Sequence, residues 1–374
     1  MTRGLRWLIG TALLATLACT PPSRPGTESG APPAPPGAPT PTVPVASPAA
    51  TAPARVALRV GHTAAVPWAG IYLALARGYF AEEGLDIELE LFASGEQQIP
   101  ALATDQISAS GLGLSAGLFS AAARGVALKV VAGVSSNEPG FSSSALVVRK
   151  DLLDSGAVRT LADLRGRTVA TIAQSASNSI ALSRGLQAAG VADSEVDLVA
   201  MPSPDMVAAL ANSAIDAALP TEPFVARAVQ LGVGVRWKGM DELYPGQLLT
   251  TIGYSPAFVR EQPDAARRFL VAYLRGARDY ADAFRYGHGR QAVSEVLAEY
   301  TTIKDVALYD LMTPSGISPD GDINRDSMQF DQEWYIAHGY LRERAALDQL
   351  VDQRFREAAL QRLGPYRPPA ARGN

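Results

Sequence analysis

Cysteine and histidine are the residues that this chain has least of. Cys19 is the single cysteine among 374 residues, so no disulfide can form within one chain. Histidine occurs three times, at His62, His288 and His338, and these positions are too scattered to match a metal-ligating pattern. We therefore expect neither a metal site nor a cofactor.

An excess of charge of one sign is also missing. The chain has 33 Lys and Arg against 37 Asp and Glu, which gives a net charge of −4. Such a balance offers no basic surface to a phosphate backbone, so we do not expect a nucleic-acid partner. With 47% hydrophobic residues and a length sufficient for two domains, the chain is typical of a globular protein.

The N-terminus has the pattern of a secretory signal. Arg3 and Arg6 precede an apolar run that is too short to cross a bilayer as a helix and that ends at Cys19. The letters LATLAC resemble a bacterial lipobox, whose cysteine is lipidated and becomes the new N-terminus. That pattern prefers leucine where this chain has Thr16, so ordinary signal cleavage nearby is the alternative. We predict a lipoprotein signal peptide over residues 1–19 and lipidation of Cys19.

A linker follows the predicted anchor. Residues 20–55 consist mainly of Pro, Ala, Thr, Ser and Gly, with almost no large apolar side chain. Such a segment cannot bury enough surface to fold and is expected to be an extended, partly polyproline spacer. A signal, a lipid-ready cysteine and a spacer together predict a body tethered outside the cytoplasmic membrane, in the periplasm or at the cell surface.

The body begins with a β-α-β pattern. Residues 56–61 alternate as a strand does, residues 69–84 have apolar side chains at helical spacing, and residues 85–91 alternate strictly. A strand, helix and strand in this order predict two parallel strands joined by a right-handed crossover.

Two further units place serines between a strand and a helix. The apolar strand over residues 168–173 is followed by a polar turn with Ser175 and Ser177, and the strand over residues 107–113 is followed by Ser115. A helix start binds anionic or strongly polar groups, because its first N–H groups lack partners. The alternative is that these serines only cap the helices that follow them.

Several phrases resemble one family of binding proteins. The sequence AGIYLALARGYFAEEGLDIELE resembles the N-terminal signature of the periplasmic binding proteins of the nitrate, sulfonate, taurine and thiamine-precursor group, the SsuA-like and NMT1-like proteins. Further phrases follow in the family's order: DQISASGLGLS (105–115), ALVVR (145–149), LADLRGR (161–167), the strand and serine turn (168–178), and AIDAALPTEPF (214–224). The resemblance covers most of residues 56–300. It implies an α/β, two-lobed periplasmic-binding-protein fold of type II, with a mainly parallel sheet flanked by helices in each lobe.

The same resemblance suggests how the chain is divided. We expect lobe I to contain residues 56–140 and 250–374, and lobe II to contain residues 141–249. The strand LLTTIGY (248–254) would return the chain to the first lobe, and the amphipathic helices after Pro263 would cover its sheet.

A ligand in such a fold lies in the crevice at the carboxyl ends of the strands. This rule selects Trp68, Ser94, Gly95, Ser115, Phe141, Ser175, Ser177, Asn178, Thr221 and Glu222. For Trp68 the alternative is a core position, and for Glu222 it is a bond to the backbone amides of the helix after Pro223. No Lys or Arg occurs in these loops, which favours a neutral or aromatic heterocyclic ligand, such as a pyrimidine, over a sulfonate or nitrate.

The family resemblance, together with the predicted anchor at Cys19, implies a lipid-anchored, monomeric solute-binding protein that works with the permease and ATPase of an ABC importer. It is expected to change shape between open and closed forms and not to be an enzyme. An enzyme on the same fold, related to thiamine-pyrimidine synthases or menaquinone-pathway lyases, is one alternative. The synthases depend on a cysteine-rich stretch and a histidine, which the loops of this chain lack. A ligand sensor for a membrane receptor is the other alternative.

Overall fold

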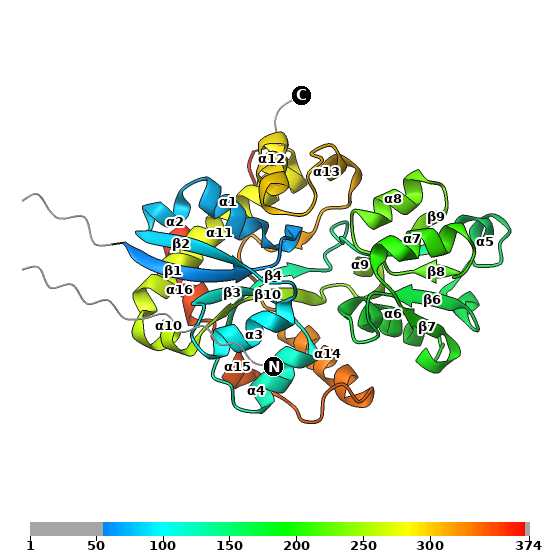
Figure 1. Ribbon diagram of the computed structural model, residues 1–374, viewed down its shortest axis with the longest axis horizontal. Coiled ribbons are helices and arrows are strands. Elements are labelled where there is room, and N and C mark those ends of the chain that lie inside the picture. Colours follow the sequence, from blue (N-terminus) through cyan, green and yellow to red (C-terminus); the bar gives the residue numbers. More distant parts are fainter. Residues whose placement is uncertain (1–54, 371–374) are drawn as a thin grey trace, which may run out of the picture. The chain divides into compact units, whose positions relative to one another are not determined.

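A computed structural model describes residues 55–370 of the chain. The predicted signal peptide, Cys19 and nearly all of the predicted linker lie outside the described residues. Every described residue belongs to one compact unit, Pro53–Asn374, which contains two β-sheets (Figure 1). We call the six-stranded sheet and its helices lobe I, and the five-stranded sheet and its helices lobe II.

The sheet of lobe I has the strand order β11-β4-β10-β3-β1-β2. Its strands are β1 (Val56–His62), β2 (Leu85–Leu91), β3 (Ala109–Gly113), β4 (Lys129–Ser136), β10 (Leu248–Tyr254) and β11 (Gly316–Ile317). The strands β1, β2 and β3 are parallel, as the β-α-β pattern predicted. The returning strand β10 inserts between β3 and β4 and runs antiparallel to both.

Helices cover both faces of this sheet. They are η1 (Val66–Trp68), α1 (Ala69–Ala76), α2 (Tyr79–Glu82), α3 (Gly95–Ala103), α4 (Ala116–Ala123), α10 (Pro256–Glu261), α11 (Pro263–Tyr286), α12 (Arg290–Tyr300), α13 (Leu308–Leu311), α14 (Arg325–Ala337), α15 (Leu347–Leu350) and α16 (Arg354–Leu363). One hydrophobic cluster packs α1, α2, α11 and α16 on one face, and a second packs α3, α4, α14 and α15 on the other.

Glycines set two details of this lobe. The helix expected over residues 69–84 is divided into α1 and α2 by Gly78, whose φ of 73° is the left-handed conformation that glycine adopts at low cost. The helices α1 and α11 approach most closely at Gly70 and Gly276. A Cβ on Gly276 would lie 2.1 Å from the carbonyl oxygen of Gly70, so this contact requires glycine.

The sheet of lobe II has the order β7-β6-β8-β5-β9. Its strands are β5 (Ala145–Arg149), β6 (Thr168–Thr171), β7 (Asp197–Ala200), β8 (Ala217–Ala218) and β9 (Gly234–Gly239). Its helices are α5 (Lys150–Asp154), η2 (Leu161–Leu164), α6 (Ser177–Ala188), η3 (Asp193–Glu195), α7 (Ser203–Ala211), α8 (Phe224–Gln230) and α9 (Met240–Leu243). The strands β6, β7 and β8 are parallel, whereas β5 pairs antiparallel with β8 and β9.

The two-lobed α/β fold with mainly parallel sheets is confirmed. In lobe I, β1, β2, β3 and β4 run in one direction, and β10 and β11 run against them. In lobe II, β5 is the one strand of the sheet that runs against the others.

The helix α14 joins the two lobes a third time. It belongs to the C-terminal part of lobe I, yet it packs against both α4 and α6. Its Trp334 and Tyr335 share one hydrophobic cluster with Leu182 and Leu186 of lobe II. The core therefore continues from one lobe into the other along this helix, which lies below the linking strands in Figure 1.

Candidate functional site

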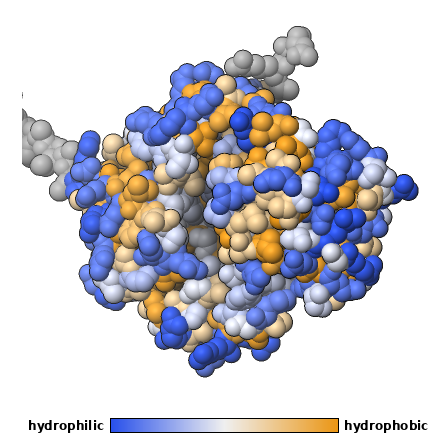
Figure 2. Space-filling view, turned by 45° about the vertical axis from the view of Figure 1, so that its right-hand side comes forward, coloured by the Kyte–Doolittle hydropathy of each residue, from blue (hydrophilic) through white to orange (hydrophobic). Residues whose placement is uncertain are grey.

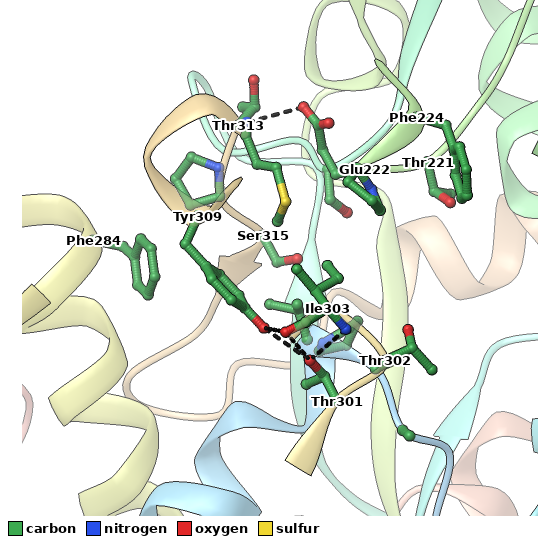
Figure 3. A pocket seen from close by; sticks show the side chains of 18 of the residues that line it. Thr221, Glu222, Phe224, Phe284, Thr301, Thr302, Ile303, Tyr309, Thr313 and Ser315 are labelled. Atoms are coloured by element: carbon green, nitrogen blue, oxygen red, sulfur yellow. Dashed lines mark hydrogen bonds between the residues drawn. The ribbon is translucent and has the colours of Figure 1, made fainter. Parts of the chain in front are cut away.

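A cavity of about 330 Å³ lies between the lobes. We call it the interlobe cavity. Lobe I contributes Ala64, Ala65, Val66, Pro67, Tyr280, Phe284, Thr301, Thr302, Ile303, Tyr309, Met312, Thr313, Pro314 and Ser315, and lobe II contributes Ser143, Thr221, Glu222, Pro223 and Phe224 (Figure 3). The molecular surface is hollowed near the middle of the face seen in Figure 2, with apolar and polar side chains around the recess.

Glu222 connects the two walls of the cavity. Its Oε2 accepts a hydrogen bond of 3.0 Å from the backbone N–H of Ala226 in α8. Its Oε1 accepts one of 3.0 Å from the backbone N–H of Thr313, which belongs to lobe I (Figure 3). Burial raises the pKa of this carboxyl, and the two backbone N–H groups partly offset that effect by stabilising the charged form.

Ser315 supplies a polar group without a partner. The residue is 4% exposed, and its hydroxyl has no hydrogen-bond partner among residues 55–370. Its backbone N–H donates to the hydroxyl of Tyr280 at 3.0 Å, so that phenol accepts one bond and retains its own proton for donation. A buried hydroxyl without a partner is costly, which makes Ser315 a candidate ligand contact in this cavity.

The segment between α12 and β11 is held in place by its own side chains. Thr301 and Tyr309 share a hydrogen bond of 2.8 Å between their hydroxyls, and Tyr309 also donates to the carbonyl of Ile303 at 3.2 Å (Figure 3). This network fixes the loop that presents Thr313 and Ser315 to the cavity.

The cavity is poor in charge. Its lining contains no Lys or Arg, and Glu222 is its one carboxylate. Burial raises the pKa of the phenols of Tyr280 and Tyr309, so both stay protonated as hydrogen-bond donors and acceptors. Together with Phe224 and Phe284, these rings suit a neutral ligand with a flat apolar body.

Residues 51–298 match the model of the NMT1-like family. The chain belongs to this family. The match covers about two thirds of the chain and includes every strand of lobe II and most strands of lobe I. It confirms the resemblance found in the sequence. No curated protein matches this NMT1-like protein significantly.

Solved structures share the fold of this NMT1-like protein at low sequence identity. The periplasmic aliphatic sulphonate-binding protein SsuA from Escherichia coli is 19% identical, with a TM-score of 0.65, over 81% of this chain and 100% of that one. The periplasmic nitrate-binding protein NrtA from Synechocystis PCC 6803 is 17% identical, with a TM-score of 0.61, over 84% and 90%. The desulfurization enzyme DSZB is 16% identical, with a TM-score of 0.57, over 83% and 100%.

The interlobe cavity brings together only two of the residues selected from the sequence. Thr221 and Glu222 line it, at the turn between β8 and α8. The bond from Ala226 shows that Glu222 does hold the start of α8, as the alternative interpretation expected, while its other oxygen reaches lobe I.

The indole of Trp68 lies in the core of lobe I. It is 4% exposed and covers Gly111 of β3, where a Cβ would come within 2.3 Å of the ring. Its Nε1 donates to the hydroxyl of Thr63 at 2.7 Å, so the polar edge is satisfied internally. This placement corresponds to the core position that we considered as the alternative.

The first serine turn also has structural partners. Ser115 begins α4 as its N-cap and accepts a hydrogen bond of 3.3 Å from the backbone N–H of Leu118. Ser94 precedes α3 without a side-chain capping bond and is exposed. Gly95 follows it, and a Cβ there would approach the backbone nitrogen of Gly113 at 3.5 Å, so these two loops are neighbours.

The second serine turn leaves its helix start open. The N-cap of α6 is Ala176, which has no side chain that could cap. The carbonyl of Ser175 accepts from the hydroxyl of Tyr335, and the carbonyl of Ser177 accepts from Gln247. Asn178 is buried and donates to the carbonyl of Leu219 at 3.3 Å. The alternative interpretation, in which Ser175 or Ser177 caps this helix, is therefore wrong.

Phe141 lies in the link between β4 and β5. The guanidinium of Arg285 covers its ring at 4.7 Å, and the same group pairs with Glu138 at 2.6 Å. The phenyl ring thus packs at the lobe junction, outside the lining of the interlobe cavity.

Sequence reasoning missed most of the cavity lining, including Tyr280, Thr301, Thr313 and Ser315. These residues lie in the C-terminal helical part, where the apolar periodicity indicated only a cover for the sheet. The sequence signal available was the TPSG phrase at 313–316, a turn between two helical stretches. Within residues 55–370 no group of His, Cys, Asp and Glu could hold a metal ion, and no helix is long and apolar enough to cross a membrane.

Proposed function

We propose that the chain is the solute-binding protein of an ABC importer and captures a small, neutral, aromatic ligand in the interlobe cavity. The proposal rests on one observation: residues of both lobes line the interlobe cavity. A ligand that contacts both lobes favours the arrangement in which they are close, because it has differential affinity for the two forms. The closed form would then be read by the permease and ATPase.

The chemistry of the lining supports a neutral ligand over an oxyanion. A sulfonate or nitrate would enter a cavity that has no cationic side chain and one buried carboxylate, Glu222. The hydroxyls of Ser315 and Tyr280 supply directional hydrogen bonds, and Phe224 and Phe284 supply flat apolar contact. An aromatic heterocycle such as a pyrimidine combines the two requirements.

A binding role is favoured over an enzymatic one. The desulfurization enzyme DSZB shares the fold, so the architecture alone does not decide between the classes. The cavity lining contains neither cysteine nor histidine, and Glu222 already accepts two backbone N–H groups. The side chains of the cavity lining offer hydrogen bonds and packing surface, and none of them is a nucleophile paired with a base.

The proposed extracytoplasmic location rests on the N-terminal sequence. A signal ending at Cys19 and a spacer over residues 20–55 suggest a lipid-anchored body on the extracytoplasmic side, acting as a monomer. The division of the body into residues 56–140 with 250–374, and 141–249, is part of the same proposal. The end of β4, the start of β5 and the start of β10 lie close to those boundaries.

A ligand screen by thermal shift tests the function. Pyrimidines, flavins, sulfonates and nitrate would be added to the purified protein, and a ligand of the folded state raises its melting temperature. We expect a neutral heterocycle to do so and Ser315→Ala to weaken its binding about three- to tenfold, the value of one neutral hydrogen bond. A sulfonate or nitrate that binds in its place would overturn the proposed ligand class, and turnover of any of these compounds would overturn the binding role.

A further inference from the structure

A second cavity of about 330 Å³ lies where α14 of lobe I meets lobe II. We call it the junction cavity. Lobe II contributes Gln174, Ser179, Leu182, Ser183, Leu186, Asp193, Val196, Asp197 and Leu198, and lobe I contributes Trp334, His338 and Tyr340. It shares no lining residue with the interlobe cavity, so its chemistry can be considered independently of the proposed function.

One wall of the junction cavity is aromatic. The rings of Trp334 and His338 are stacked, with centroids 3.9 Å apart, and the ring of Tyr340 lies nearly parallel to that of Trp334 at 5.9 Å. The indole is fixed because its Nε1 donates to the hydroxyl of Ser183 at 2.9 Å. Tyr340 also lines the cavity and is 38% exposed.

Two carboxylates also line the cavity, next to the aromatic rings. Asp193 accepts hydrogen bonds on Oδ2 from Ser183 at 2.6 Å and makes a contact of 3.0 Å with Nε2 of His338. Its Oδ1 is buried and has no partner among the described residues. Asp197 also lines the cavity and is exposed, with one bond of 3.2 Å from the hydroxyl of Thr168. The lining contains no Lys or Arg, and its one basic side chain, His338, contacts Oδ2 of Asp193 and the carbonyl of Trp334.

An apolar floor completes the cavity. Leu182, Leu186 and Val196 are buried beneath it, and they belong to the hydrophobic cluster that runs from lobe I into lobe II. A ligand that fits must therefore have a flat apolar part that packs on the floor and the rings. It must also have a positively charged or hydrogen-bond-donating part that contacts the carboxylates.

From these features we propose that the junction cavity is a second ligand site, which binds a small aromatic ammonium compound. The ring of the ligand stacks beside Trp334 and Tyr340, and its ammonium group donates to Asp193 and Asp197. An ammonium group near aromatic faces gains further from the electrostatic attraction of their π-systems. Because the walls come from both lobes, an occupied junction cavity also strengthens the contact between α14 and lobe II.

The probe for this site is phenethylamine, and the matched control compound is phenylacetate, which has a similar size and the opposite charge. Isothermal titration calorimetry on the full chain would measure both. We expect phenethylamine to bind and phenylacetate not to bind, because two carboxylates repel an anion. Asp193→Asn should weaken phenethylamine about tenfold or more, the value of a hydrogen bond to a charged group.

Three further variants separate the outcomes. Asp154→Asn removes an exposed carboxylate of lobe II elsewhere and should leave phenethylamine binding unchanged. Tyr340→Leu removes the half-exposed ring without opening the core and should weaken binding about threefold or more. The Tyr340→Leu variant still tests the site if Asp193→Asn does not fold. Ser315→Ala alters the interlobe cavity without removing a side-chain bond between the lobes, and should have no effect.

Two results would overturn the site. The first is the absence of phenethylamine binding to the wild-type chain. The second is binding that Ser315→Ala weakens while Asp193→Asn and Tyr340→Leu do not, since the amine would then occupy the interlobe cavity. Failure of the heterocycle screen would leave the phenethylamine result unaffected, so the two proposals can fail separately.

Discussion

The carboxylate of Glu222 in lobe II accepts a hydrogen bond of 3.0 Å from the backbone N–H of Thr313 in lobe I. Its second oxygen accepts the N–H of Ala226 at the start of α8. One side chain thus holds a helix within its own lobe and a loop of the other lobe. The link forms a wall of the interlobe cavity, so ligand contact and lobe contact are connected at this residue.

Removal of this carboxylate should loosen the lobes. We expect Glu222→Ala to increase the radius of gyration in small-angle X-ray scattering, because the bond to Thr313 is lost. The loss of the bond to Ala226 should also cost about 1 kcal/mol of stability, as for a helix cap. Glu261→Ala, which removes an exposed carboxylate of α10, is the matched control and should change neither quantity. Equal radii for both variants would contradict a linking role for Glu222.

The two serine turns should respond differently to the same substitution. Ser115 caps α4 through its bond with Leu118, so Ser115→Ala should lower the free energy of unfolding by about 1 kcal/mol. Ser175 contributes only its backbone carbonyl to a hydrogen bond, so Ser175→Ala should leave stability nearly unchanged. Urea unfolding of both variants measures the difference, and an equal loss in both would show that the hydroxyl of Ser175 has a structural partner.

A buried polar network crosses the junction of the lobes. Asn137, Gln247 and Asp331 are each at most 1% exposed. The side chain of Asn137 donates to that of Gln247 at 3.0 Å, and Gln247 donates to Asp331 at 3.2 Å. Burial raises the pKa of Asp331 to about 7, although Gln247, Tyr244 and Arg184 favour its charged form.

This shift predicts that Asp331 makes stability depend on pH. Between about pH 4 and pH 7 the folded chain keeps a proton on Asp331 that the unfolded chain has lost, so stability from this group falls as pH rises and levels off above 7. Asp331→Asn cannot lose this proton and should be more stable than the wild type at pH 8, by up to about 4 kcal/mol, and similar to it at pH 4.

Urea unfolding of the wild type, Asp331→Asn and Asp154→Asn at both pH values tests this effect. The exposed Asp154 controls for the general titration of carboxylates and should show little difference from the wild type. If Asp331→Asn is less stable than the wild type at pH 8, the ionised form of Asp331 is stabilising and the expected direction of the pH dependence is wrong.

The predicted anchor at Cys19 is tested by fractionation of cells. Cys19→Ala removes the thiol that a diacylglyceryl group would modify, so the variant should appear in the soluble fraction or remain unprocessed. The wild-type chain should stay with the membrane. A Cys19→Ala variant that is still membrane-bound and correctly cleaved would show that another feature holds the protein there.

Local patterns in the sequence were sufficient for the elements and their broad arrangement. Strict alternation over residues 85–91 and helical spacing after Pro263 each depend on neighbouring residues, and β2 and α11 lie where they indicate. The order of the family phrases added the two-lobed fold. These signals are readable because side-chain periodicity is a property of the strand or helix itself.

The candidate site depended on contacts that no local pattern encodes. Thr221 and Glu222 could be selected from the sequence because they follow a strand. Ser315 lies far along the chain from Glu222, in the loop between α13 and β11. The alternative that a serine caps α6 is wrong, because the chain enters that helix through Ala176 and the serines on either side of it do not cap.

What the sequence determined by itself is the family, the two α/β lobes and the composition of the predicted anchor. Only the tertiary structure decided which loops meet. The physical reason is that the walls of both cavities come from distant segments: Glu222 and Thr313 are 91 residues apart, and Asp193 and His338 are 145 apart. Such pairs form when two lobes and the C-terminal helices pack together, and their hydrogen bonds exist only once that packing has excluded water.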